Sequence, residues 1–360
     1  MQRQLPARQQ PPDQQDTKLL FSLTPASVIN RYDFIGNPSY IILACQARGS
    51  TFAVWVTSIV RYRDNDHQDI TIKGSALDHS QVMPTQNTTG LVQLPMYDWI
   101  EARMATNALW SCIHHALKRQ GIASPETLDR NQTPEFGWLS PQLLLSQTCG
   151  LALMQELRGR VAVLGCFSWQ GQPSSGDYHS VIIARDTLAI EKLSALCGQR
   201  AAINYESSYS GCLALKRWTS LMVKPGAVFS KVITTGSHRE SIRAVSTGLA
   251  DIAAIDCVSW TLARRFDTTV QSLKVVARTD DRPGLPLITA MRSSPSMLDG
   301  LRVALNEAVT ILDPTSRDVL GISAFVVAHK HDYDIIDHDW HKFGDTELVS
   351  DHPHNVVDRG

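Results

Sequence analysis

Short apolar runs alternate with amphipathic segments from about residue 90 to residue 320. The runs are rich in Val, Ile, Leu and Ala, which is typical of strands buried on both faces, and they lie at residues 91–94, 143–145, 161–164, 180–184, 201–204, 231–234, 252–255, 273–277 and 285–289. Between them, apolar residues recur every three or four positions, which predicts helices at residues 99–120, 210–222, 238–247, 257–266, 297–312 and 316–320. This alternation predicts the α/β class with a parallel or mixed sheet.

The first 89 residues have a different character. Residues 1–17 are rich in Gln and Pro and poor in apolar residues, so we expect them to be disordered. Apolar residues at 40–45 and 52–60 flank Arg48-Gly49, which predicts a β-hairpin. A polar segment follows, so we expect residues 1–89 to form an N-terminal extension, partly disordered and with a hairpin.

The composition is that of a globular protein with a sizeable core, because 43% of the 360 residues are hydrophobic and 19% are charged. A net charge of -1 with no basic stripe argues against a nucleic-acid partner. The seven cysteines have no CxxC spacing and are odd in number, which favours free thiols and a reducing compartment. The first 16 residues lack the apolar core of a secretory signal, and Arg48 interrupts the longest apolar stretch, so we expect no membrane span.

Polar clusters lie where an expected strand ends and an expected helix begins, at residues 97–98, 146–148, 207–211 and 235–238. Helix N-termini offer unpaired N–H groups and a partial positive charge, so several of them around one crevice would hold an oxyanion. Ser and Asp are also common N-caps, and both Asp98 with Glu101 and Ser237 with Glu240 have capping-box spacing. Asp256 also follows a strand, where it would accept a proton from a ligand, pair with an amine or cap a helix.

Six short segments occur in the order and spacing of one known family: LPMYD at residues 94–98, LLLSQTCG at 143–150, the stretch 204–211 with Ser210-Gly211, TGSH at 235–238, ADIAAID at 250–256 and PGLP at 283–286. Over residues 90–328 the chain resembles the phosphate/phosphite/phosphonate substrate-binding proteins of ABC transporters. The resemblance implies a type 2 periplasmic-binding-protein fold with two α/β lobes around a central cleft. Lobe 1 would comprise residues 90–183 and 279–330, and lobe 2 residues 184–278, with hinge crossovers near 178–184 and 273–278. Residues 331–360 would form a polar tail rich in His and Asp.

The resemblance also implies a function without catalysis. The chain would capture a small phosphate- or phosphonate-like oxyanion for an ABC transporter permease, with no cofactor or metal. Carried over position by position, the ligand contacts would be Tyr97, Ser146, Gln147, Thr148, Tyr178, Ser208, Ser210, Gly211, His238 and Asp256. Where such proteins often have Ser-Gln-Ser-Gly-Tyr, this chain has Ser208-Tyr209-Ser210-Gly211-Cys212, so we expect one aromatic wall of the site to be lost and another gained.

Other interpretations remain open from the residues alone. Cys149 with His179 or His238 would be the nucleophile and base of a hydrolase, or else a packed thiol. The histidines after residue 328 lack a fixed metal-binding spacing, which favours a solvated tail, and neither GxGxxG nor a Walker sequence occurs. The family implies the periplasm, whereas the start of this sequence, without a signal, would leave a cytoplasmic ligand sensor or a degenerate binding module.

Overall fold

The computed structural model describes residues 90–349, apart from 174, 190–192 and 223–227, together with four short strands nearer the N-terminus. The chain divides into two compact units at Gln86 and Asn87. In the first unit, β1 (Cys45–Gln46) pairs antiparallel with β2 (Trp55–Val56), as a hairpin around Arg48-Gly49 requires, and β3 (Val60–Arg63) pairs antiparallel with β4 (Asp69–Ile72). The disorder expected for residues 1–17 lies outside the described residues.

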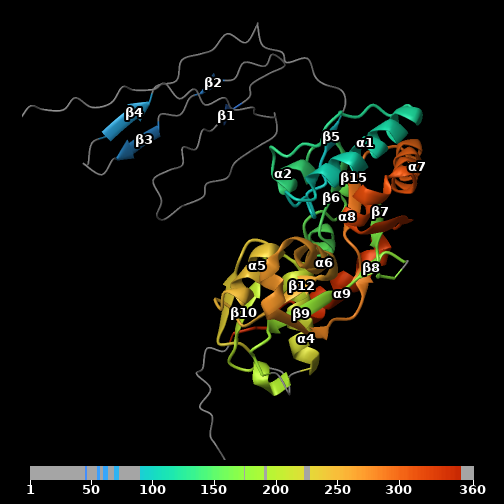
Figure 1. The fold of residues 1–360 in the computed structure, drawn as a ribbon. Helices are drawn as coiled ribbons and strands as arrows, with labels where there is room; N and C mark the ends of the chain where they lie inside the picture. The colour runs from blue at the N-terminus through green and yellow to red at the C-terminus, as the bar shows by residue number, and fades with distance from the viewer. Residues whose placement is uncertain are drawn as a thin grey trace, which may run out of the picture. The chain divides into compact units, whose positions relative to one another are not determined.

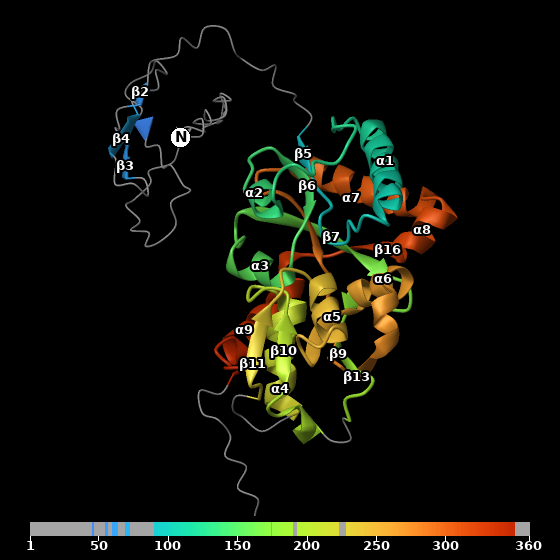
Figure 2. The ribbon, with the colours of Figure 1, turned by 60° about the vertical axis from the view of Figure 1, so that its left-hand side comes forward.

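The second unit contains two five-stranded mixed sheets, which lie in separate lobes (Figures 1 and 2). The first sheet has the order β16-β7-β15-β6-β5. Its strands are β5 (Leu91–Val92), β6 (Leu143–Gln147), β7 (Val161–Trp169), β15 (Pro286–Ala290) and β16 (Ile322–Val327). The second sheet has the order β11-β10-β12-β9-β13. Its strands are β9 (Ser180–Arg185), β10 (Arg200–Ile203), β11 (Lys231–Thr234), β12 (Ile252–Asp256) and β13 (Leu273–Arg278).

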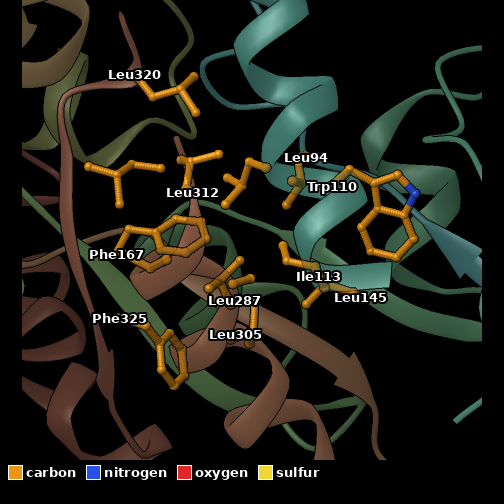
Figure 3. Packing of buried hydrophobic residues seen from close by; sticks show 14 of the residues in the cluster. Leu94, Trp110, Ile113, Leu145, Phe167, Leu287, Leu305, Leu312, Leu320 and Phe325 are labelled. Atoms are coloured by element: carbon orange, nitrogen blue, oxygen red, sulfur yellow. The ribbon is translucent and has the colours of Figure 1, made fainter. Parts of the chain in front are cut away.

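Helices cover both faces of the first sheet, which explains why its strands are apolar without alternation. On one face, α1 (Arg103–Arg119) and α7 (Pro295–Ile311) pack on a cluster that includes Ile113, Leu145 and Leu287 (Figure 3). On the other face, Ile288 packs in a cluster supplied by α3 (Gly150–Gln155) and α9 (Asp334–Phe343). Neighbouring residues of β15 thus enter two different cores.

The second sheet is covered in the same way. One face packs on α4 (Ala214–Met222), which contributes Trp218, and the opposite face packs on α5 (His238–Ser246), which contributes Ile242. The remaining helices are α2 (Pro134–Trp138), α6 (Cys257–Phe266) and α8 (Pro314–Leu320). A π-helical turn, η2 (Tyr209–Leu213), runs directly into α4. Among the residues that the structure describes, no helix is both long enough and apolar enough to span a bilayer.

The chain passes between the lobes beside the short strands β8 (Asp177–Tyr178) and β14 (Arg282–Pro283), which pair antiparallel. Sequence analysis placed the first change of lobe between residues 183 and 184. The structure differs, because the whole of β9 pairs with β12 and β13 of the second sheet. A boundary within β9 would divide a strand whose hydrogen bonds all lie in one sheet, so the crossover lies before Ser180.

The segment after residue 330 is not simply a solvated tail. It forms α9, in which Ile336 and Phe343 are buried in the core that covers the first sheet. Beyond this helix, Phe229 donates a backbone hydrogen bond of 2.8 Å to Leu348, so the chain ends its described part against lobe 2. The apolar residues of α9 are separated by Asp, His and Lys, which hides the helical spacing in the composition. The expectation of a solvated tail is therefore wrong for this helix.

Candidate functional site

A cleft of about 660 Å³ opens between the two lobes. Lobe 1 lines it with Met96, Tyr97 and Trp138, among others, and lobe 2 contributes Ser210 and His238. In a mixed α/β fold, a ligand site forms where strand ends and helix starts from two sheets face one crevice. The cleft therefore has the position expected for the site.

The first helix start in the cleft follows β10. Ser208 caps the π-helical turn by accepting a hydrogen bond of 3.2 Å from the backbone N–H of Gly211. The hydroxyl of Ser210 lies 2.8 Å from Nε2 of His238. The turn thus brings two serine hydroxyls to the cleft. That of Ser208 already accepts a hydrogen bond from the backbone of the same turn.

The second helix start is that of α5. Ser237 caps it by accepting a hydrogen bond of 3.1 Å from the backbone N–H of Glu240, so Ser237 is the N-cap of α5. The reciprocal bond of a capping box is not among the described contacts, and the Glu240 carboxylate pairs with Arg243. His238 is the first residue of the helix and is mostly buried, with 11% of its side chain exposed. Burial lowers the pKa of His238, against the opposing effect of the Asp256 carboxylate. The imidazole is therefore neutral at pH 7.

Asp256 joins the helix starts to lobe 1. Its Oδ1 accepts hydrogen bonds of 2.9 Å and 2.8 Å from the backbone N–H groups of Val258 and Ser259, which makes it the N-cap of α6. The same oxygen accepts a bond of 3.1 Å from the hydroxyl of Tyr97 across the cleft, and Oδ2 lies 3.3 Å from Nε2 of His238. Asp256 therefore both caps α6 and lines the cleft.

Five of the ten predicted contacts line the cleft, namely Tyr97, Ser208, Ser210, His238 and Asp256. The other five are buried and are not among the residues that line the cleft, namely Ser146, Gln147, Thr148, Tyr178 and Gly211. Burial also raises the pKa of the Tyr178 phenol well above its usual value. The sequence located the strand ends correctly but did not show which side chain on each end turns outward.

Tyr209 does not form the new aromatic wall that the sequence suggested. Its ring is buried among the core residues that cover the first sheet, and its hydroxyl donates a hydrogen bond of 2.7 Å to Asp339 in α9. Asp339 also accepts from Arg282 at 2.7 Å and lies 3.3 Å from Nε of Arg217. Tyr209 therefore ties the cleft turn to the C-terminal helix behind it.

Several cleft residues were missed from the sequence because their roles depend on long-range contacts. The most prominent is Arg239, whose guanidinium stacks on Trp99 at 4.4 Å, forms two hydrogen bonds of 3.0 Å and 2.8 Å with Glu101, and also pairs with Asp267. Trp99 and Glu101 belong to lobe 1 and Arg239 to lobe 2. We call Arg239, Trp99 and Glu101 the clasp, because together they hold the two lobes against each other.

The lining also includes an aromatic ring and acidic side chains from lobe 1. Trp138 donates an indole hydrogen bond of 2.9 Å to the backbone of Gln147, which fixes the ring in the wall. Glu135 and Glu156 also line the cleft, and neither has an ion-pair partner within the part of the chain that the structure describes. No sequence pattern distinguishes these two glutamates, since exposed glutamates are common on any helix.

Cys149 lines the cleft as a thiol. Its sulfur accepts a hydrogen bond from the backbone N–H of Tyr209 at 3.4 Å, and burial raises its pKa. A nucleophilic cysteine needs the opposite shift, because the thiolate is the reactive form. Neither His179 nor His238 hydrogen-bonds Cys149 among the described contacts.

The sequence matches the model of a known family over residues 137–333, which is more than half of the chain. That family is described as "ABC transporter, phosphonate, periplasmic substrate-binding protein". No curated protein sequence matches the chain.

Solved structures with the same fold include PhnD1 from Prochlorococcus marinus in complex with methylphosphonate. It is 18% identical, has a TM-score of 0.57, and is matched over 71% of this chain and 98% of its own. XAC2383 from Xanthomonas citri, solved with chloride and with ATP, is 18% identical in the chloride form, with a TM-score of 0.57 over 72% of this chain and 99% of its own. A phosphonate transporter component from Pseudomonas aeruginosa, PA3383, is 15% identical, with a TM-score of 0.53 over 70% of this chain and 85% of its own.

These similarities confirm the type 2 periplasmic-binding-protein fold that the sequence predicted. With the family match over most of both lobes, they also confirm a solute-binding role. The chain belongs to the phosphonate-binding family of periplasmic substrate-binding proteins of ABC transporters.

Proposed function

We propose that the chain captures a small phosphonate-like oxyanion in the cleft, as the substrate-binding component of an ABC-type uptake system. The observation that supports the proposal is that two helix starts and one carboxylate lie close together around one ring nitrogen of His238. Nε2 of His238 lies 2.8 Å from the Ser210 hydroxyl and 3.3 Å from the Asp256 carboxylate. If the neutral ring carries its proton on Nε2 and donates to Asp256, the Ser210 hydroxyl is free to donate to a ligand.

The charges around the cleft favour recognition by dipoles and hydrogen bonds. Arg239 is the one cationic side chain among the lining residues that the structure describes, and Glu101 and Asp267 already neutralise it. An anion would therefore be held by the backbone N–H groups of the helix starts and by hydroxyls, which bind phosphate-like groups without a counter-ion. Asp256 would repel a bare anion near it, but it would attract the amine of an aminoalkylphosphonate.

The geometry also supports a binding protein without catalysis. In a catalytic triad, the carboxylate holds the histidine from the nitrogen opposite to the nucleophile. In this cleft Asp256 and Ser210 both lie at Nε2 of His238, so the carboxylate does not orient the ring for proton transfer from the serine. The raised pKa of Cys149 argues likewise against a cysteine hydrolase.

The family membership supports two further parts of the proposal, a permease partner and a periplasmic location. Cell fractionation with antibody detection, together with mass spectrometry of the native N-terminus, would test the location. Protein recovered only with cytoplasmic markers would favour the ligand-sensor alternative.

Calorimetric titration tests the ligand. Phosphate, phosphite, methylphosphonate and 2-aminoethylphosphonate would be titrated into the wild-type chain and into Ser210→Ala. A charge-assisted hydrogen bond contributes about 1.5 to 3 kcal/mol, so Ser210→Ala should weaken the best ligand roughly tenfold to a hundredfold. Ser230→Ala is a matched control, because Ser230 is exposed in the same lobe and outside the cleft lining. The proposal fails if none of these anions binds more tightly than millimolar.

A further inference from the structure

Asn204 is a buried cleft residue whose backbone is hydrogen-bonded to the turn before α5. It follows the last residue of β10, and 9% of its surface is exposed. Its carbonyl accepts a hydrogen bond of 2.9 Å from the backbone N–H of Gly236, just before α5. The residue therefore lies between the turn that leads to Ser210 and the turn that leads to His238, in a fixed position.

The side-chain amide of Asn204 is not satisfied by the protein. Oδ1 is buried and has no hydrogen-bond partner, and Nδ2 makes no hydrogen bond either, among the residues that the structure describes. An amide oxygen only accepts hydrogen bonds, so an oxyanion cannot satisfy Oδ1, whereas Nδ2 is a donor to which a ligand oxygen can bind. The group of this side chain that remains for an anion is therefore Nδ2.

Gly211 provides the space that the amide oxygen of Asn204 occupies. A Cβ built on Gly211 would lie 1.9 Å from Oδ1 of Asn204 and 3.2 Å from Cε1 of His238. The amide oxygen thus occupies the space that any other residue at position 211 would fill. With Oδ1 packed against this glycine, Nδ2 is the unpartnered group that Asn204, a residue of the cleft lining, offers to a ligand.

We propose that Asn204 is a ligand-binding residue, whose Nδ2 donates a hydrogen bond to the oxyanion held at the Ser210 and His238 helix starts. This deepens the proposed function and rests on it. An uncharged amide donor suits a cleft in which no free cation is present among the described lining residues. It also assigns Gly211 a role different from direct contact, namely leaving room for Asn204.

Two substitutions at this position separate ligand contact from packing. Asn204→Ala removes the donor, and Asn204→Asp keeps the shape but replaces the donor with a negative charge. Titrated with the best oxyanion of the panel at pH 7.5, Asn204→Ala should bind roughly tenfold to a hundredfold more weakly than wild type, and Asn204→Asp more weakly still. Asn306→Asp is the control, since Asn306 is exposed on α7 and makes the same charge change away from the cleft.

A second cycle tests the link to Gly211. Gly211→Ala should weaken binding in the wild-type background but have a smaller effect in an Asn204→Ala background, where the clashing amide is absent. Thermal melting and circular dichroism would verify that each variant is folded. If Gly211→Ala is not folded, the two Asn204 variants decide, and if one Asn204 variant is not folded, the other decides.

The outcomes are distinguishable. If Ser210→Ala weakens binding while both Asn204 variants bind like wild type, the assignment of Asn204 is wrong and the proposed function stands. Tighter binding by Asn204→Asp than by wild type also overturns it, because that result requires a cationic group at this position. If the wild-type chain binds no anion of the panel, the proposed function and the assignment of Asn204 fail together.

Discussion

Replacing Asp339 by Ala should destabilise the protein strongly, because this carboxylate is the common partner of two arginines and a tyrosine. Only 3% of its side chain is exposed, and it lies 2.7 Å from Nε of Arg282, 3.3 Å from Nε of Arg217 and 2.7 Å from the Tyr209 hydroxyl. Removing one member of a buried charge network leaves the others unpaired, which costs about 3 to 5 kcal/mol. For a domain of this size the melting temperature should fall by on the order of 10 °C.

The pH dependence gives this prediction a second readout. Burial raises the pKa of Asp339, but the hydrogen bonds from Arg282 and Tyr209 outweigh it, so the pKa in the folded protein is lowered. A carboxyl with a lowered folded pKa contributes stability above its unfolded pKa of about 3.9, and that contribution is lost as the pH falls through the folded value. The difference in stability between wild type and Asp339→Ala should thus be constant near neutrality and shrink in acid.

Differential scanning calorimetry from pH 7 to pH 3 measures both effects. Asp345→Ala provides the comparison, because Asp345 is exposed and makes no ion pair among the described contacts, so its loss should change stability by less than about 0.5 kcal/mol. If Asp339→Ala melts like Asp345→Ala at pH 7, or if the difference persists unchanged in acid, the network does not have the role assigned to it.

Three other substitutions test separate parts of the molecule. Arg239→Ala should increase the radius of gyration measured by X-ray scattering, because the clasp to Glu101 is lost, and an unchanged radius would contradict this. His238→Gln should remove a loss of stability that wild type shows as the pH falls below about 6.5, since burial lowers the folded pKa of His238 and the unfolded chain takes up the proton first; identical pH profiles would count against it. Leu287→Ala should lower the free energy of unfolding by about 2 to 5 kcal/mol in urea denaturation, whereas Leu249→Ala, at a site 56% exposed, should change it little.

Much of the second lobe could be predicted from the sequence. The strand Lys231–Thr234 and the helix Cys257–Phe266 occur with the predicted bounds. The strand β12 (Ile252–Asp256), predicted at residues 252–255, is buried along its whole length between helices on both faces, so its apolar run is continuous and ends at a polar residue. For β12, one local signal, the apolar run, coincided with burial.

Two other elements were not predicted. The strand β16 was overlooked although residues 324–327 form a continuous apolar run. The helix α9 was missed because its apolar residues, such as Ile336, lie among Asp, His and Lys. In the site, the polar segment around Ser210 was found, but the inward turn of Tyr209 was not, since it depends on Asp339 130 residues away. Asn204 lay in a recognised segment, yet only its orphaned amide marks it as a candidate contact.

The clasp affects the rates at which a ligand binds in the cleft and leaves it. Arg239, Trp99 and Glu101 join the lobes through protein atoms alone, so a movement that widens the cleft must separate an ion pair and a stacked ring. The pair is partly exposed, with 25% and 33% of the two side chains accessible, and dissolved ions therefore screen it. Added salt should accelerate both capture and release, whereas steering of an anion by long-range charge would be slowed by salt. Stopped-flow measurements of ligand association and dissociation at two ionic strengths would show whether opening of the clasp sets these rates.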